Sequence, residues 1–159
     1  MPVRLKPIKP SKKFLGDIGA LEHAIESALD DTADFALDLH KKTTTTWDTK
    51  VNFYIRKTKF GRSIGTRSSI WKYVDQGTRP HTIQARKVPN LKFRAGGFRA
   101  KTRPNTITSS GGARGGQWVT KRAVRHPGTE ARNFSEAIGK RAEKELGRAM
   151  RKKFKGLFG

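Results

Sequence analysis

The chain has 159 residues, of which 35 are Lys or Arg and 13 are Asp or Glu, so its formal net charge is +22, and it contains no cysteine. This length suits one compact domain, and the missing thiols exclude disulfides, cysteine nucleophiles and cysteine-ligated zinc. No apolar run approaches the roughly 20 residues of a membrane span, and no apolar signal segment follows the charged start, so we expect a soluble, unsecreted protein.

The first 16 residues form a basic segment with three prolines and no acid. This composition resists helix formation and favours an extended arm. A chain this positive attracts polyanions, either nucleic acid or an acidic protein. We therefore predict that the arm contacts DNA or a partner through its cations, which are Arg4, Lys6, Lys9, Lys12 and Lys13.

Residues 17 to about 42 are predicted to form an amphipathic helix, because apolar residues recur there every three or four positions. The run of threonines that starts at Thr43 is expected to end this helix. Residues 17–40 carry seven acids and no Lys or Arg. An acidic element in a basic chain favours head-to-tail association between copies, although the same charges can also pair within one subunit.

Short antiparallel strands are expected in the middle of the chain. Alternating apolar residues over 51–55 predict one strand, and residues 70–74 favour either a second strand or a short helix before a turn. Further strands are expected at residues 82–84, 90–93 and 118–124.

Residues 94–117 are rich in Gly, Ser, Thr and Arg and are too long for an ordinary connection, so they predict a protruding, mobile loop. Its glycine cluster lacks the lysine and the helix of a phosphate-binding loop. Arginines near Phe98 and Trp118 are typical of nucleic-acid binders, although a solvated charged loop explains them equally well. The candidate contacts to DNA or a partner are Arg94, Arg99, Lys101, Arg103 and Arg114.

Residues 133–155 predict a second amphipathic helix, with Asn133 and Glu136 placed as a capping box. Residues 156–159 are expected to form a tail. The fold class is therefore α+β: an N-terminal amphipathic helix, a small antiparallel sheet with a long basic loop, and a C-terminal amphipathic helix, all in one domain over residues 17–155.

Catalytic and metal-binding patterns are scarce. His81 and His126 each lie beside a proline, and no nucleophile elbow or zinc-binding histidine spacing is present. We predict no catalytic residue, no metal site and no cofactor; an enzyme remains an alternative only if the fold gathers His81, His126 and an acid. Pro127 and Gly128 predict a type II turn before the second helix.

Several short motifs occur in a characteristic order, and they are densest from residue 73 to residue 134. In chain order they are Tyr73-Val74-Asp75-Gln76 with Gly77 and Thr78, then Pro80 and His81 with Ile83, then Leu91 and Phe93, then Val124 with His126, Pro127, Gly128 and Thr129, and finally Phe134 at the start of a helix. Together they resemble the neck and tail-completion family of minor virion proteins of long-tailed double-stranded DNA bacteriophages. The basic arm and the Arg-rich loop depart from the family's usual pattern.

This resemblance implies a structural subunit of the virion, assembled in the host cytoplasm and without enzymatic activity. Such subunits form a ring, six-fold or twelve-fold, around the DNA channel. The implied partners are other copies of the chain, portal, head-closure or adaptor proteins, the tail tube or tail terminator, and double-stranded DNA bound without sequence readout, but no membrane. Charge alone favours an alternative, a free-standing nucleic-acid-binding protein of the ribosomal or nucleoid kind, which the acidic first helix disfavours.

Overall fold

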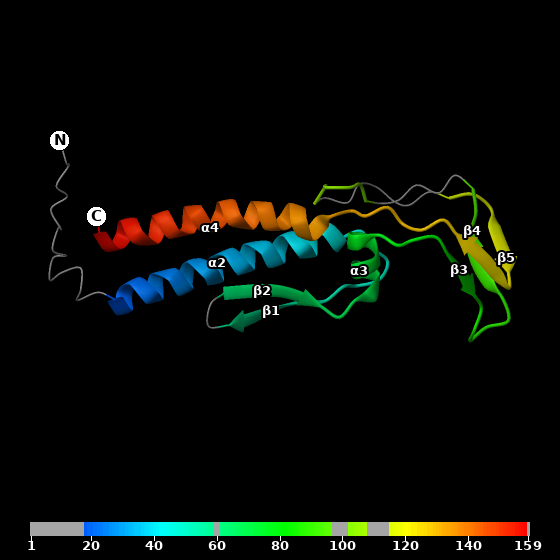
Figure 1. The fold of residues 1–159 in the computed structure, drawn as a ribbon, viewed down its shortest axis with the longest axis horizontal. Helices are drawn as coiled ribbons and strands as arrows, with labels where there is room; N and C mark the ends of the chain where they lie inside the picture. The colour runs from blue at the N-terminus through cyan, green and yellow to red at the C-terminus, as the bar shows by residue number, and fades with distance from the viewer. Residues whose placement is uncertain (1–17, 59–60, 97–101, 108–114, 159) are drawn as a thin grey trace, which may run out of the picture.

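A computed structural model of the chain describes residues 18–58, 61–96, 102–107 and 115–158. The molecule is elongated, with two long antiparallel helices towards one end and short strands at the other (Figure 1). The α+β class predicted from the sequence is confirmed. In chain order the elements are α2 (Ile18–Thr44), β1 (Phe53–Thr58), β2 (Gly61–Thr66), α3 (Ser69–Gln76), β3 (His81–Gln84), β4 (Leu91–Arg94), β5 (Trp118–Lys121), β6 (Ala123–His126) and α4 (Phe134–Phe158).

The two long helices pack along each other over most of their lengths (Figure 1). Four of the nine buried residues of α2 are alanines, namely Ala24, Ala28, Ala33 and Ala36, and small side chains allow close approach of two helix backbones. The helix ends two residues later than predicted, because Thr43 and Thr44 lie within its last turn. Their hydroxyls donate to the carbonyls of Leu39 and Lys41 at 2.8 and 3.1 Å, an arrangement that lets threonine remain helical.

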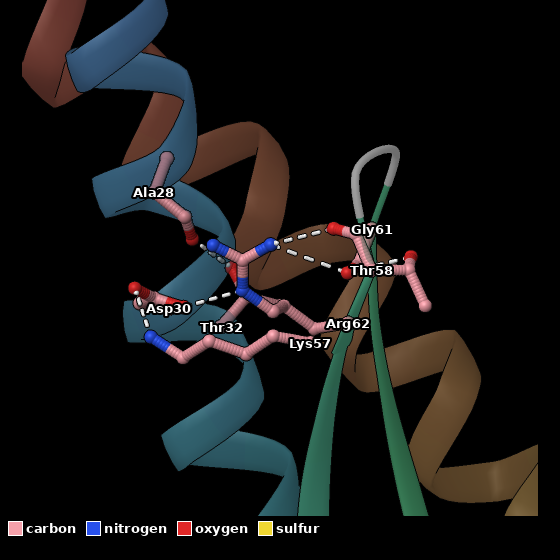
Figure 2. A network of polar contacts seen from close by, with 7 residues as sticks. All are labelled: Ala28, Asp30, Thr32, Lys57, Thr58, Gly61 and Arg62. Carbon is pink, nitrogen blue, oxygen red and sulfur yellow. Dashed lines mark hydrogen bonds and ion pairs between the residues drawn. The ribbon is translucent and has the colours of Figure 1, made fainter.

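The β1–β2 hairpin lies along α2 (Figure 1), and a carboxylate on the helix fastens it there. Asp30 accepts from Arg62 Nε on β2 and from Lys57 Nζ on β1 (2.5 and 2.8 Å; Figure 2). These bonds lower the pKa of Asp30 from 3.8 to about 2, the Arg62 bond contributing most. The side chain of Arg62 is only 10% exposed, so this pair links the hairpin and the helix at a largely covered position.

The core lies where α2, the β1–β2 hairpin, α3 and α4 meet. Residues 70–74 belong to a helix, α3, whose preceding residue Ser68 accepts from the Trp71 N–H at 3.3 Å. Trp71 is central: its ring centroid lies 4.9 Å from that of Phe53 and 5.4 Å from that of Phe134. The buried members of this core are Ala36, Leu39, Val51, Trp71, Ile107, Phe134 and Ile138. We call α2, the β1–β2 hairpin, α3 and α4 the body.

The start of α4 is capped by a residue from α3. Asp75 is buried and accepts from the N–H and the hydroxyl of Ser135 at 3.0 and 2.6 Å. The predicted capping box does not form, because the Asn133 N–H donates to the Asp75 carbonyl and Glu136 pairs with Lys140. At its other end α4 continues to Phe158, so residues 156–158, predicted as a tail, are helical.

Residues 102–107, predicted to belong to a protruding loop, lie against the body instead (Figure 1). Thr102 and Ile107 are only 7% and 3% exposed, and Ile107 is part of the core. The Asn105 N–H donates to the Arg132 carbonyl at 2.7 Å, just before α4. An apolar side chain in an otherwise polar stretch thus anchors the connection. Residues 97–101 and 108–114 of the predicted loop lie outside the described residues.

Candidate functional site

The strands β3 to β6 form a bent ribbon made of two separate two-stranded pairs. The predicted strand over residues 118–124 is two strands, since β5 pairs with β4 and β6 pairs with β3, both antiparallel. Hydrogen bonds from Ala85 to Arg122 and from Ala95 to Gln117 extend the two pairings, and residues 86–90 interrupt them. We call residues 78–96 and 115–129 the distal element. Each of these residues is exposed or half-buried, and none is buried.

Glycines allow the distal element to leave the body. Thr78 and Thr129 form a β-bridge with backbone bonds of 2.9 and 3.1 Å. Gly77 has φ 74° and ψ 175°, a conformation that essentially only glycine adopts, and a Cβ there would lie 2.6 Å from the Thr129 carbonyl oxygen. Gly128 has φ 95°, and a Cβ added there would likewise collide with the Thr78 carbonyl oxygen. Motifs about 50 positions apart in the sequence therefore form one junction.

His81 and His126 are directly opposite each other in the β3–β6 pairing, with ring centroids 5.2 Å apart. His81 Nδ1 lies 2.8 Å from the Arg79 carbonyl, so this nitrogen carries the proton and donates. His126 Nδ1 accepts from the Gly128 N–H at 3.0 Å. The fold thus joins the two predicted histidines. No group of three His, Cys, Asp or Glu side chains suited to a metal occurs in the described parts of the chain.

An open groove of about 760 Å³ lies on the distal element and is lined by both halves of the ribbon. Its lining includes apolar side chains, namely Ile83, Leu91, Phe93, Trp118 and Val124, together with the cations Lys92, Arg94 and Arg125. The Trp118 side chain is 59% exposed, and the Lys92 Nζ and Arg94 Cζ atoms lie 5.4 and 4.9 Å from its ring centroid. The groove therefore combines uncovered apolar surface with positive charge.

The distal element is uniformly basic. Its residues contain no Asp or Glu. Its cations are Arg79, Arg86, Lys87, Lys92, Arg94, Lys121, Arg122 and Arg125.

The acids of α2 fall into two groups, which refines the expectation that they act between copies. Three pair within the subunit: Asp30 with the β1–β2 hairpin, Asp31 with Lys153 of α4 at 3.0 Å, and Asp38 with Lys42 of its own helix at 2.6 Å. The other three, Glu22, Glu26 and Asp34, are exposed and form no ion pair with another described residue. Pairing within one copy therefore accounts for half of these acids.

The structure places the predicted site residues in three settings. Seven motif positions lie at or beside the junction, which are Gly77, Thr78, His81, His126, Pro127, Gly128 and Thr129. Phe134, in contrast, is fully buried in the core of its own chain, so it lies on no subunit surface. Arg94 lines the groove and Arg103 is exposed beside the body. The arm residues Arg4, Lys6, Lys9, Lys12 and Lys13, and the loop residues Arg99, Lys101 and Arg114, lie outside the described residues.

Sequence reasoning did not predict the groove: Ile83 and Val124 belonged only to the family motifs, and Lys92 and Arg125 were not singled out. A partial signal was present, because Leu91 and Phe93 alternate with basic residues along 91–94, yet no further amphipathic element remains to cover this strand face. An apolar strand face without a covering layer is a candidate interaction surface.

Comparison with protein-family models gives no match, and comparisons with curated proteins and with solved structures give none either. None of the helices in the described part of the chain is both long enough and apolar enough to cross a membrane.

Proposed function

We propose that this chain is a ring subunit of the neck or tail-completion region of a long-tailed, double-stranded DNA bacteriophage. It joins the tail to the portal and head-closure proteins around the DNA channel, works in the virion, and acts by binding and assembly without catalysis. The observation that carries this proposal is the junction. Seven of the family-motif positions, from residues 77–81 and 126–129, meet at or beside one bridge between Thr78 and Thr129.

The distal element supports an assembly role. A two-stranded ribbon is marginally stable by itself in water, and here none of its side chains is buried. Its apolar groove is open to solvent, and large exposed apolar surfaces mark interaction sites on soluble proteins. Such an element gains stability when another protein covers it, which suits a subunit of a larger assembly.

The charge supports proximity to DNA. The eight cations of the distal element add to those of the arm and the loop, and cations along a channel attract phosphate without reading sequence. Contacts of this kind exchange readily, so DNA can still slide past them.

The histidine pair supports a structural role over a catalytic one. Both Nδ1 atoms are engaged by backbone groups two residues away in the sequence, so each ring fastens the local chain beside the junction.

Mass photometry and negative-stain imaging test the proposal, at low and high salt and with or without DNA and purified portal or head-closure proteins. We expect closed rings, either of the chain alone or seated on a partner ring. A matched pair of variants sharpens the test: Gly128→Ala disturbs the junction, whereas Gly139→Ala changes an exposed glycine of α4 whose Cβ would meet nothing within 4 Å. Ring formation lost in both variants, or in neither, contradicts a role for the junction.

A second candidate, a free-standing nucleic-acid-binding protein, is favoured by one observation, the exposed Trp118 flanked by Lys92 and Arg94. Aromatic rings beside cations serve as stacking platforms for unpaired bases. This candidate predicts a monomer whose affinity for single-stranded DNA falls steeply with salt and drops in Trp118→Ala. Rings that form without DNA, and that form equally well in Trp118→Ala, exclude this second candidate.

A further inference from the structure

The groove of the distal element leaves apolar side chains open to solvent. It exposes Trp118 and Ile83 at 59% and 36% of their surfaces and holds about 760 Å³, a volume within the range of protein ligand clefts. The cations Lys92, Arg94 and Arg125 line it. A complementary occupant combines aliphatic side chains with carboxylates on one narrow face.

Charge excludes most other parts of a second copy as the occupant. Another distal element carries eight cations and no acid, and the β1–β2 hairpin has cations and no acid over residues 53–66. The helix α4 has eight cations and three acids. Like charges brought together across an interface cost several kcal/mol. The one element of this chain with net negative charge is α2.

The beginning of α2 fits best, because none of its acids is held in an ion pair with another described residue. Glu22 and Glu26 are exposed and have no ion pair among the described residues, whereas Asp30, Asp31 and Asp38 are engaged. Ile18 is 55% exposed. Residues 18, 22 and 26 are spaced by four, so they form a single ridge on the helix. This ridge offers one aliphatic side chain and two carboxylates.

We infer that the first two turns of α2 in one copy dock in the distal groove of the next copy. Ile18 meets the apolar lining around Ile83 and Trp118, and Glu22 and Glu26 meet the cations of the groove. This is a helix-in-groove contact with a charged margin. This contact is the subunit interface of the proposed ring. The inference rests on the proposed function only in that the contacts close into a ring.

The arrangement within one chain makes this contact head-to-tail. The start of α2 and the distal element lie at opposite ends of the long axis (Figure 1), so a chain cannot fill its own groove. A contact between two different surfaces leaves a free end after each step, and it therefore produces rings or filaments rather than closed dimers.

A charge exchange tests the electrostatic half of the contact. The ridge variant combines Glu22→Lys with Glu26→Lys, and the groove variant combines Lys92→Glu with Arg125→Glu. We expect each to weaken self-association by at least ~10-fold by analytical ultracentrifugation, because like charges then face each other. Mixing the two variants restores assembly, since the basic ridge of one now fits the acidic groove of the other. Asp34→Lys, the same reversal farther along α2, leaves assembly unchanged.

A disulfide trap tests the apolar half. The chain has no cysteine, so Ile18→Cys combined with Ile83→Cys places one thiol on each side of the contact. Mild oxidation of this double variant yields a ladder of covalent oligomers. Each single variant yields covalent dimers at most.

The outcomes separate this inference from the proposed function. If both charge variants still form the rings that the wild type forms, and the double-cysteine chain gives no ladder, this interface is overturned and the proposed ring remains. A ladder and a restored mixture, in a chain that never docks on portal, head-closure or tail proteins, confirm the interface and overturn the neck role. A monomer under all conditions, with no ladder at high protein concentration, overturns both.

Discussion

The body and the distal element obtain their order in opposite ways. In the body, large side chains such as Trp71, Phe134 and Ile138 are almost completely removed from water. In the distal element no side chain is buried, and strand pairing and the junction hold the ribbon in place.

This difference indicates a division of labour. Burial of apolar surface is the main source of folding free energy, so the body supplies the stability of the whole chain. The distal element buries little apolar surface within the chain, and the interface proposed above uses the surface that remains exposed. Substitutions in the two regions should therefore separate stability from assembly.

The largest effect is expected from Phe134→Ala in the body. Removing a fully buried phenylalanine costs about 3–5 kcal/mol, a large part of the 5–15 kcal/mol that typically stabilises a domain. The matched change Phe93→Ala, at a half-buried position of the groove, should cost about 1 kcal/mol or less while weakening assembly. Chemical denaturation and sedimentation measure the two effects.

If Phe134→Ala leaves too little folded protein, Ile138→Val gives the same comparison with a cost of about 0.5–1.5 kcal/mol. Equal destabilisation by the substitutions at positions 93 and 134 contradicts the division between the two regions.

The next effect concerns the junction that joins them. Gly77→Ala places a side chain in a backbone conformation that essentially only glycine adopts and drives its Cβ towards the Thr129 carbonyl, at a cost of about 1–3 kcal/mol. Hydrogen exchange should show faster opening of β3 and β6 than of α2. Uniform loss of protection in all elements shows instead that the junction belongs to the body.

The two long helices of the body were predictable from the sequence, because their apolar residues recur at helical spacing, whereas β2 was not predicted and residues 70–74 were left open between strand and helix. The errors arose where a distant residue decided the outcome. Asp75 caps α4 from 60 positions away, which no local capping pattern reveals. Ile107 is an isolated apolar residue in a stretch of Gly, Ser, Thr and Arg, so its burial was invisible in the composition.

The candidate site was less predictable for a related reason. The opposition of His81 and His126 depends on strand register, and register over two short ribbons is weakly specified by their sequence pattern. The division of residues 118–124 into β5 and β6 depends on which partner each half pairs with. Motif order found the junction residues, but only the pairing showed that they meet.

A smaller effect, confined to the body, should appear on acidification. Burial lowers the pKa of His40 below its ordinary value of 6.5, more than the Ala36 carbonyl and Asp75 raise it. Neutral His40 thus stabilises the fold fully above pH 6.5, and this contribution is lost as the pH falls through the lowered pKa. Denaturation between about pH 7 and pH 5 should show a steeper loss for wild type than for His40→Asn. His23→Asn, at an exposed position of the same helix, should keep the wild-type slope.

The smallest effect is expected at the hairpin. The lowered pKa of Asp30, about 2 instead of 3.8, means that its carboxylate stabilises the fold above pH 3.8 and loses this effect as the pH falls through about 2. The carboxylate is 37% exposed, so water and salt screen much of the interaction. Asp30→Asn should therefore speed hydrogen exchange in β1 and β2 with little change in the denaturation midpoint, and Asp34→Asn should do neither. Asp30 pairs with Arg62 and Lys57, whereas Asp34 forms no ion pair with another described residue. Faster exchange of the hairpin in both variants would therefore show that the overall charge of the helix, rather than these contacts, holds the hairpin on α2.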